Sequence, residues 1–172
     1  MVWPVSAVDR ARSSVAAALR TLGQLLTDAA RSTTGPRLAV ARALGEARRF
    51  VAIAAFELGM LPAHAWPRRG EGLSLDALDR LAGATFVVVD QETDADMAEA
   101  VRPQDDAVSA WLVTGAERLS TGEMAVVPPA ESSGLGLALK ELAEEAPASL
   151  RAALEARVLL QAEIENAVAV RT

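Results

Sequence analysis

Apolar residues recur at helical spacing from Ser6 to about residue 30. The apolar positions of this stretch are Val8, Val15, Leu19, Leu22 and Leu26. The polar positions on the opposite side are Arg10, Ser14, Thr21, Gln24, Asp28 and Arg31. This spacing predicts a long amphipathic first helix that buries its apolar stripe.

A second helix is predicted from about Pro36 to Met60, because the turn over residues 32–36 supplies an N-cap and a proline for a helix start. Its second half, residues 50–56, is apolar on all sides. We therefore expect this helix to be central to the bundle. Residues 61–70 contain two prolines and a glycine and are predicted to form a loop.

A third helix is predicted after Ser74, which can act as its N-cap, with Asp76 placed favourably in the first turn. Its buried stripe is predicted to be Leu75, Leu78, Ala82, Thr85 and Val89. Residues 86–89 are rich in strand-forming types, but the run is short and helical patterning flanks it. We therefore assign it to the helix.

Residues 90–106 carry seven acidic residues and are predicted to be a solvated helix end followed by a linker. Pro103 is expected to restart a helix that ends near Leu119. A long loop over residues 120–134, a short helix over residues 135–145 and a last helix from Pro147 to about Val170 follow. The inward residues predicted for the two longer helices are Val108, Trp111, Leu112, Leu119, Leu150, Leu154, Leu160, Ile164 and Val168.

The pattern as a whole predicts an all-α fold, an antiparallel helical bundle of five to six helices formed by residues 1–172 as a single domain. Alanine, leucine, arginine and glutamate dominate the composition, and all four favour helices. Uncharged runs such as residues 81–89 and 107–116 are too short to cross a bilayer, which needs about 20 apolar residues. The first residues also lack the pattern of a signal peptide.

The composition narrows the possible chemistry. The chain has no cysteine and one histidine, which excludes disulfides, thiol nucleophiles and zinc sites built on paired histidines. That histidine, His64, lies between two prolines with no second histidine beside it. Residues 134–136 lack the third glycine and the preceding strand of a dinucleotide-binding loop. We predict no catalytic residue, no cofactor and no metal site, and we expect that the protein is not an enzyme.

Charge is distributed unevenly along the chain. Residues 1–70 hold ten arginines and four acidic residues, a net charge of +6, whereas residues 71–172 have a net charge of −12. The basic half could face anionic lipid headgroups, or it could pack against the acidic half of the same fold. The net charge of −6 and the lack of a basic run interleaved with aromatics argue against nucleic-acid binding.

Glu57 ends an apolar helical stretch, so its carboxylate must be ion-paired, hydrogen-bonded or neutralised by a proton. It could be a proton-coupled or ligand-binding group, or it could pair with an arginine of another helix. Arg42, Glu46 and Arg49 are spaced to form ion pairs along one helix. These two arginines and Glu57 are the candidate residues for a ligand site or for structural ion pairs. Arg68 and Arg69 form a basic pair in the predicted loop, where they could bind an anion or remain solvated.

One segment resembles a known family. Val2-Trp3-Pro4-Val5, followed by an arginine-rich and alanine/leucine-rich helix, resembles the segment that leaves the first membrane bundle in the fusaric acid resistance/aromatic acid exporter family. The arginine- and glutamate-bearing helix that begins near Arg42, and the helix over residues 75–90, are similar in character to the soluble region of that family. The resemblance covers roughly residues 2–90.

The resemblance implies that this chain is a cytoplasmic module, excised from a larger inner-membrane efflux protein for aromatic or other organic acids in a bacterium. Its implied partners are the membrane portion of the same polypeptide, further copies of itself in a homo-oligomer, and an anionic lipid surface. Positive-inside bias would place the arginine-rich half nearest the membrane. The candidate membrane-proximal residues are Trp3, Arg10, Arg12, Arg68 and Arg69.

An alternative function is a self-contained ligand-binding or protein-interaction helical domain of the sensor type, unrelated to transport. In such a domain Arg42, Arg49 or Arg68 would hold a carboxylate through charge-assisted hydrogen bonds. The two hypotheses differ in what surrounds the segment, because only the exporter requires flanking stretches of about 20 apolar residues.

Overall fold

A computed structural model describes residues 7–28, 33–58, 75–91, 95–121, 141 and 143–168. Within these residues the chain is an all-α helical bundle without strands, which confirms the predicted fold class. The helices are α1 (Ala7–Thr27), α2 (Thr34–Leu58), α3 (Leu75–Asp90), α4 (Ala95–Thr121) and α6 (Ala148–Val168). None of the described helices is both long enough and apolar enough to cross a membrane.

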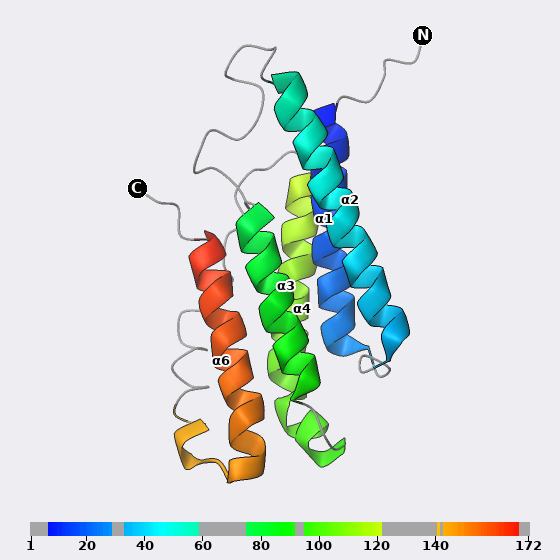
Figure 1. Cartoon of the computed structure of the whole chain (residues 1–172). Helices are drawn as coiled ribbons and strands as arrows, with labels where there is room; N and C mark the ends of the chain where they lie inside the picture. Colours follow the sequence, from blue (N-terminus) through cyan, green and yellow to red (C-terminus); the bar gives the residue numbers. More distant parts are fainter. Residues whose placement is uncertain are drawn as a thin grey trace.

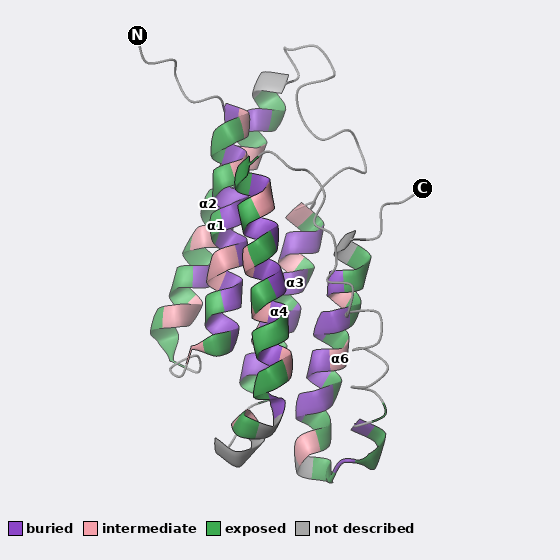
Figure 2. Cartoon of the chain, turned by 180° about the vertical axis from the view of Figure 1, so that it is seen from behind, coloured by how far each residue is buried: buried purple, intermediate pink, exposed green. Residues whose placement is uncertain are grey.

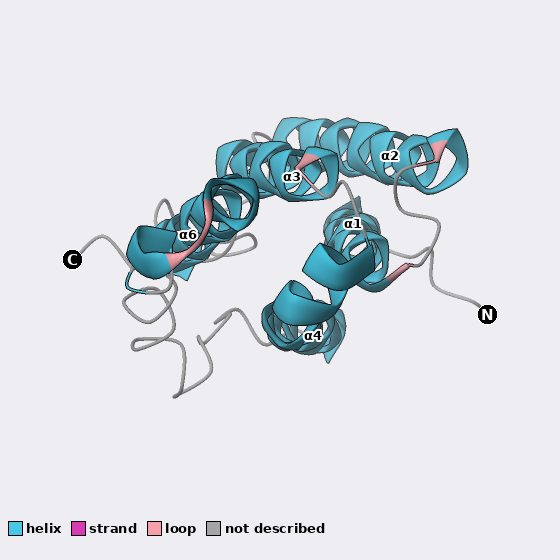
Figure 3. Cartoon of the chain, turned by 90° about the horizontal axis from the view of Figure 1, so that it is seen from below, coloured by secondary structure: helices cyan, strands magenta, loops and turns pink. Residues whose placement is uncertain are grey.

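The helices form two layers (Figure 3). Helices α2, α3 and α6 lie in one row, and α1 and α4 lie against it in a second layer. Helix α1 packs mainly on α2 and α4 and also touches α3, so it is the central helix of the bundle. Helices α1 and α2 run in opposite directions, as do α3 and α4, whereas α4 and α6 point the same way (Figure 1).

Helix α1 buries the predicted stripe. Val15, Leu19, Leu22 and Leu26 are all buried, and they belong to the main core cluster together with residues of every other helix in the described part. The assignment of Ser14 to the polar side is wrong, because Ser14 is buried and its hydroxyl donates a hydrogen bond to the Ala11 carbonyl at 2.8 Å. This local bond satisfies the hydroxyl without a partner from another helix.

Helix α2 lies at the edge of the bundle, which corrects the prediction that it is central (Figure 3). Its inner side buries Val40, Leu44, Ala47 and Ala54, while most other positions of the same helix are exposed (Figure 2). Residues 50–56 are covered on one side only: Ala54 is buried against Ala7 and Ala11 of α1, whereas Ile53 and Phe56 are exposed. This segment of α2 is therefore apolar on all sides but buried on only one.

Helix α3 matches its prediction over its whole length and packs mainly on α6. Leu78, Ala82, Thr85 and Val89 are buried, and Leu75 is partly buried against the same core. The strand-forming run over residues 86–89 is helical, as assigned from its flanks. The buried Thr85 hydroxyl donates to the Leu81 carbonyl at 2.8 Å, so it enters the core without loss of hydrogen bonding.

Helix α4 includes most of residues 90–106, so the prediction that this segment is a helix end followed by a linker is wrong. It begins at Ala95 and continues through Pro103 to Thr121, so no restart occurs at the proline. Asp105, predicted to be solvated, is buried. Buried residues on both sides of Pro103 hold α4 against the core, so the helix continues across the proline. They are Val101 before it and Val108, Trp111, Leu112 and Leu119 after it.

The last helix, α6, begins immediately after Pro147, as predicted, and ends at Val168. Leu154, Leu160 and Ile164 are buried and Leu150 is partly buried, whereas the side chain of Val168 lies outside the described residues. Of the short helix predicted before it, residues 143–145 are helical and most of the remainder is outside the described part. The predicted loop over residues 61–70 and nearly all of that over 120–134 are outside it too.

Candidate functional site

The outer face of α2 is the candidate functional surface. With 3.6 residues per turn, one side of α2 points away from α1 and the core. All residues on this side are exposed, and we define the outer face by them: Leu38, Arg42, Gly45, Glu46, Arg49, Ala52, Ile53 and Phe56. The candidate residues Arg42 and Arg49 from the sequence therefore share one surface.

The predicted ion-pair ladder along α2 is not formed. Within the described part of the chain, no ion pair joins Glu46 to Arg42 or Arg49. The guanidinium carbon of Arg49 instead lies 5.8 Å from the centre of the Phe50 ring. Arginine stacked on an aromatic ring keeps its hydrogen-bond donors available at the surface.

Other arginines of the basic half are paired with the acidic half. Arg48 donates to Asp79 of α3 at 2.7 Å, and Arg37 pairs with Asp90 at the end of the same helix. These contacts agree with the interpretation that the two halves of the sequence neutralise each other inside the fold. Both pairs are substantially exposed, so each stabilises the fold by less than about 1 kcal/mol.

The structure does not bring the remaining candidates together with this surface. Arg10 is exposed on α1, and Arg12 on the same helix lies 3.7 Å from Asp9. The backbone of Glu57 belongs to α2, but its side chain lies outside the described residues. Trp3, Arg68, Arg69 and His64 also lie outside them.

A buried ion pair joins α4 to α6, and sequence reasoning missed it. The Nε of Arg157 donates to Asp105 Oδ1 at 2.8 Å and its Nη2 donates to Oδ2 at 2.7 Å, while Nη1 donates to the Ala153 carbonyl at 2.9 Å. Both side chains are 3% exposed. The sequence did contain a sign that Asp105 is buried. At helical spacing Asp105 shares one helix face with the apolar residues at positions 101, 108 and 112.

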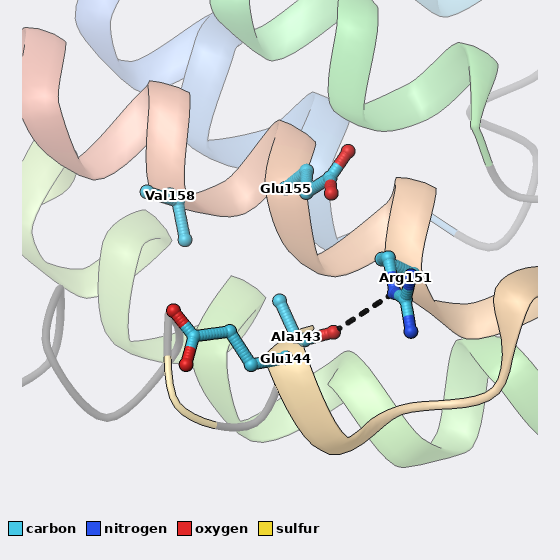
Figure 4. A pocket seen from close by; sticks show the side chains of 5 residues that line it. All are labelled: Ala143, Glu144, Arg151, Glu155 and Val158. Carbon is cyan, nitrogen blue, oxygen red and sulfur yellow. Dashed lines mark hydrogen bonds between the residues drawn. The ribbon is translucent and has the colours of Figure 1, made fainter.

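The described residues also line one open hollow of about 440 Å³ beside the start of α6 (Figure 4). Its lining is Ala143, Glu144, Arg151, Glu155 and Val158. Arg151 donates to the Ala143 and Ala146 carbonyls at 3.2 Å each, so it braces the turn that leads into α6. Neither Arg42 nor Arg49 contributes to this hollow.

No group of three or more histidine, cysteine, aspartate or glutamate side chains in the described ranges could hold a metal ion. Besides exposed ion pairs between helices, the polar features of the described structure are the buried Asp105–Arg157 pair, Arg151 at the turn before α6, and the exposed outer face of α2. The first two hold helices together, and the third is presented to solvent. Comparison of the chain with family models, with curated proteins and with solved structures finds no match.

Proposed function

We propose that this chain works by contact, as a helical assembly module, and that its parent is an inner-membrane exporter of aromatic or other organic acids. The observation that supports a contact function is the outer face of α2. There, the edge helix presents large apolar side chains and charged side chains without ion-pair partners in the described part. The exporter is proposed from the resemblance of residues 2–90 to that family.

An exposed surface of this composition suits an interface. Aromatic residues and arginine are enriched in protein–protein interfaces, and the outer face of α2 presents Phe56, Arg42 and Arg49 to solvent. Phe56 is 71% exposed and Leu38 is 56% exposed, although both are on a helix whose other side is firmly packed. Burying these two side chains against a partner would supply the apolar part of such a contact.

The sensor-type alternative has a different structural requirement. A carboxylate clamp needs arginines that converge on a concave site, as ligand pockets do. Arg42 and Arg49 lie on a convex helix face, and the hollow beside α6 takes its arginine, Arg151, from a different helix. Thermal denaturation with millimolar benzoate tests this alternative. We expect no rise in melting temperature, and a rise that Arg42→Ala abolishes would favour the sensor.

The exporter proposal is tested in the native host with the parent protein. We expect an epitope-tagged parent to sediment with inner membranes, and we expect deletion of the segment encoding this chain to increase sensitivity to aromatic acids. The native gene should encode apolar stretches of about 20 residues beside the segment. A parent found entirely in the soluble fraction, without such stretches, would contradict the proposal.

A further inference from the structure

We propose that the outer face of α2 is the surface on which a second copy of this chain docks, with the two α2 helices antiparallel about a two-fold axis near residue 47. This inference deepens the proposed contact function and rests on it. Its occupant, a copy of the same chain, is indicated by three features of α2: the positions of its apolar residues, the charges between them and a glycine at the centre.

The large apolar residues of the outer face lie near the two ends of α2. Leu38 lies near the start of α2, and Ile53 and Phe56 lie near its end. These three are among the few large apolar side chains that the described part of the chain leaves exposed. A two-fold axis at the middle of α2 brings the N-terminal end of this helix in one copy against its C-terminal end in the other copy.

The charged residues occupy the middle of the face. Arg42, Glu46 and Arg49 are exposed and have no ion-pair partner in the described ranges. By contrast Arg48, on the side that faces α3, is paired with Asp79. The positive and negative groups of the outer face therefore remain available for charges on another molecule.

Gly45 lies near the centre of the face, where, as at Gly83 of α3, the fold of one copy gives no reason for a glycine. A Cβ added there would meet no atom within 4 Å. Glycine in the middle of a helix is less stable than alanine because it loses more backbone freedom on folding. A residue without a side chain does, however, allow a second helix to approach closely.

These features fit one orientation. An antiparallel pair with its axis near residue 47 places Leu38 of one copy beside Phe56 of the other, and Arg49 beside Glu46 of the other copy. The contact occurs twice by symmetry, as in any isologous interface. A parallel pair would instead place Arg42 and Arg49 against the same arginines of the second copy, which is repulsive.

The same features favour a second copy over a membrane surface. An anionic bilayer attracts arginines but repels Glu46 at the centre of the face. A second copy supplies an arginine for that glutamate and an apolar residue for each exposed apolar end. We therefore assign the face to self-association, and lipid binding becomes an alternative outcome of the test.

Sedimentation equilibrium of the full chain over a range of concentrations tests the surface. We expect a monomer–dimer equilibrium that Phe56→Asp weakens by roughly 100-fold or more, because the symmetric interface then buries a new charge beside Leu38 at each of its two ends. The matched control is Leu159→Asp, which places the same charge at an exposed leucine of α6 and should leave the dissociation constant unchanged. Circular dichroism checks that both variants remain helical.

A charge exchange tests the orientation. Arg49→Glu and Glu46→Arg should each weaken the dimer by roughly tenfold, and the double variant should recover most of the loss, because the two charges meet across the axis. A chain that stays monomeric at all concentrations, or a double variant weaker than either single one, would overturn the inference. Binding of a monomer to vesicles of anionic phospholipid would overturn it in favour of a lipid surface.

The outcomes separate this inference from the proposed function. A dimer that is insensitive to Phe56→Asp and to the charge exchange overturns the α2 surface but leaves a contact module that uses another face. A parent protein that is soluble and has no membrane segments, combined with an α2-dependent dimer, overturns the exporter and leaves the surface intact.

Discussion

At the scale of single residues, the pair formed by Asp105 and Arg157 is the most deeply buried ion pair in the described part of the chain. Two side chains that are 3% exposed have lost almost all contact with water, and the bidentate geometry compensates each charge with the other. We predict that Asp105→Ala lowers the free energy of unfolding by about 3–5 kcal/mol, because it leaves the arginine buried without its counter-charge. Urea denaturation followed by circular dichroism measures this change.

Two further variants identify the cause of that loss. Replacing both partners, with Asp105→Leu and Arg157→Met, should recover most of the stability, since a buried ion pair exchanged for apolar residues is often neutral. Arg48→Ala removes an exposed ion pair and should lower stability by less than about 1 kcal/mol. Equal losses for Asp105→Ala and Arg48→Ala would show that burial of the first pair is unimportant.

The described glycines on helices give a second residue-scale prediction. A Cβ on Gly23 would lie 3.2 Å from the Ser109 carbonyl oxygen of α4, whereas a Cβ on Gly83 would meet nothing within 4 Å. Gly83→Ala should therefore raise the free energy of unfolding by about 0.5–1 kcal/mol through helix propensity alone. Gly23→Ala should gain less or lose stability, because the contacted atom is backbone and cannot rotate away. A larger gain at Gly23, measured by thermal denaturation, would contradict the close α1–α4 packing.

The residue scale also shows what the sequence could and could not predict. Most inward positions were predicted correctly, because large apolar residues at helical spacing have few alternatives to burial. Ser14 and Asp105 were placed in solvent because a polar side chain was taken as a sign of exposure. Each enters the core through a specific bond, to a carbonyl one turn earlier for Ser14 and to Arg157 for Asp105. The second of these bonds joins residues 52 positions apart, which no local pattern reveals.

At the scale of elements, α4 shows tertiary packing overriding a local signal. Pro103 is the ninth residue of the helix, beyond the first turn where proline is tolerated without loss. It removes one backbone hydrogen bond, and the helix persists because buried residues on both sides of the proline hold it to the bundle.

Pro103→Ala should therefore stabilise the protein, by about 1–3 kcal/mol, because it restores that hydrogen bond and relieves the steric conflict. Thermal denaturation monitored by circular dichroism measures the shift. The control is Ala110→Pro at an exposed position farther along α4, which should destabilise the fold strongly. A loss of stability in Pro103→Ala would mean that the proline sets the direction in which α4 presents Asp105.

The sequence predicted where helices begin and end better than it predicted which helix lies at the centre of the bundle. The bounds of α1, α2, α3 and α6 lie within a few residues of the predicted ones, because caps, prolines and glycines mark helix ends. The role of α2 was predicted wrongly, because an alanine-rich helix looks apolar on every side whether or not it is covered. The candidate arginines were correctly grouped on one helix, but their exposure and lack of mutual ion pairs followed only from the packing of α2 at an edge.

At the scale of the whole molecule, the two layers of helices in the described part of the chain leave the outer face of α2 uncovered. Helix α1 fills the centre, α3 and α6 close one side, and α2 presents its outer face to solvent (Figure 3). Composition and periodicity predicted the all-α class, because the sequence favours helices almost throughout. Which helix lies at the edge depends on the sum of many weak packing terms between helices, so it could not be derived from one helix at a time.

Pairing of α2 with α2 of a second copy is the central claim, and disulfide trapping tests it most directly. The natural chain has no cysteine, so Ala41→Cys and Ala52→Cys, both at exposed positions of α2, each introduce a unique thiol. In an antiparallel pair centred near residue 47, position 52 on the outer face and position 41 at its border lie opposite each other across the interface. The two copies of position 41 are then about 18 Å apart along the helix, too far for a disulfide.

Mild oxidation of each variant alone and of an equimolar mixture, resolved by non-reducing electrophoresis, gives the readout. We predict a covalent dimer in the mixture, linked between the two different variants, and little in either variant alone. Equal cross-linking of Ala41→Cys with itself would indicate a parallel arrangement, and no cross-linking in any sample at dimer-forming concentration would contradict pairing through α2.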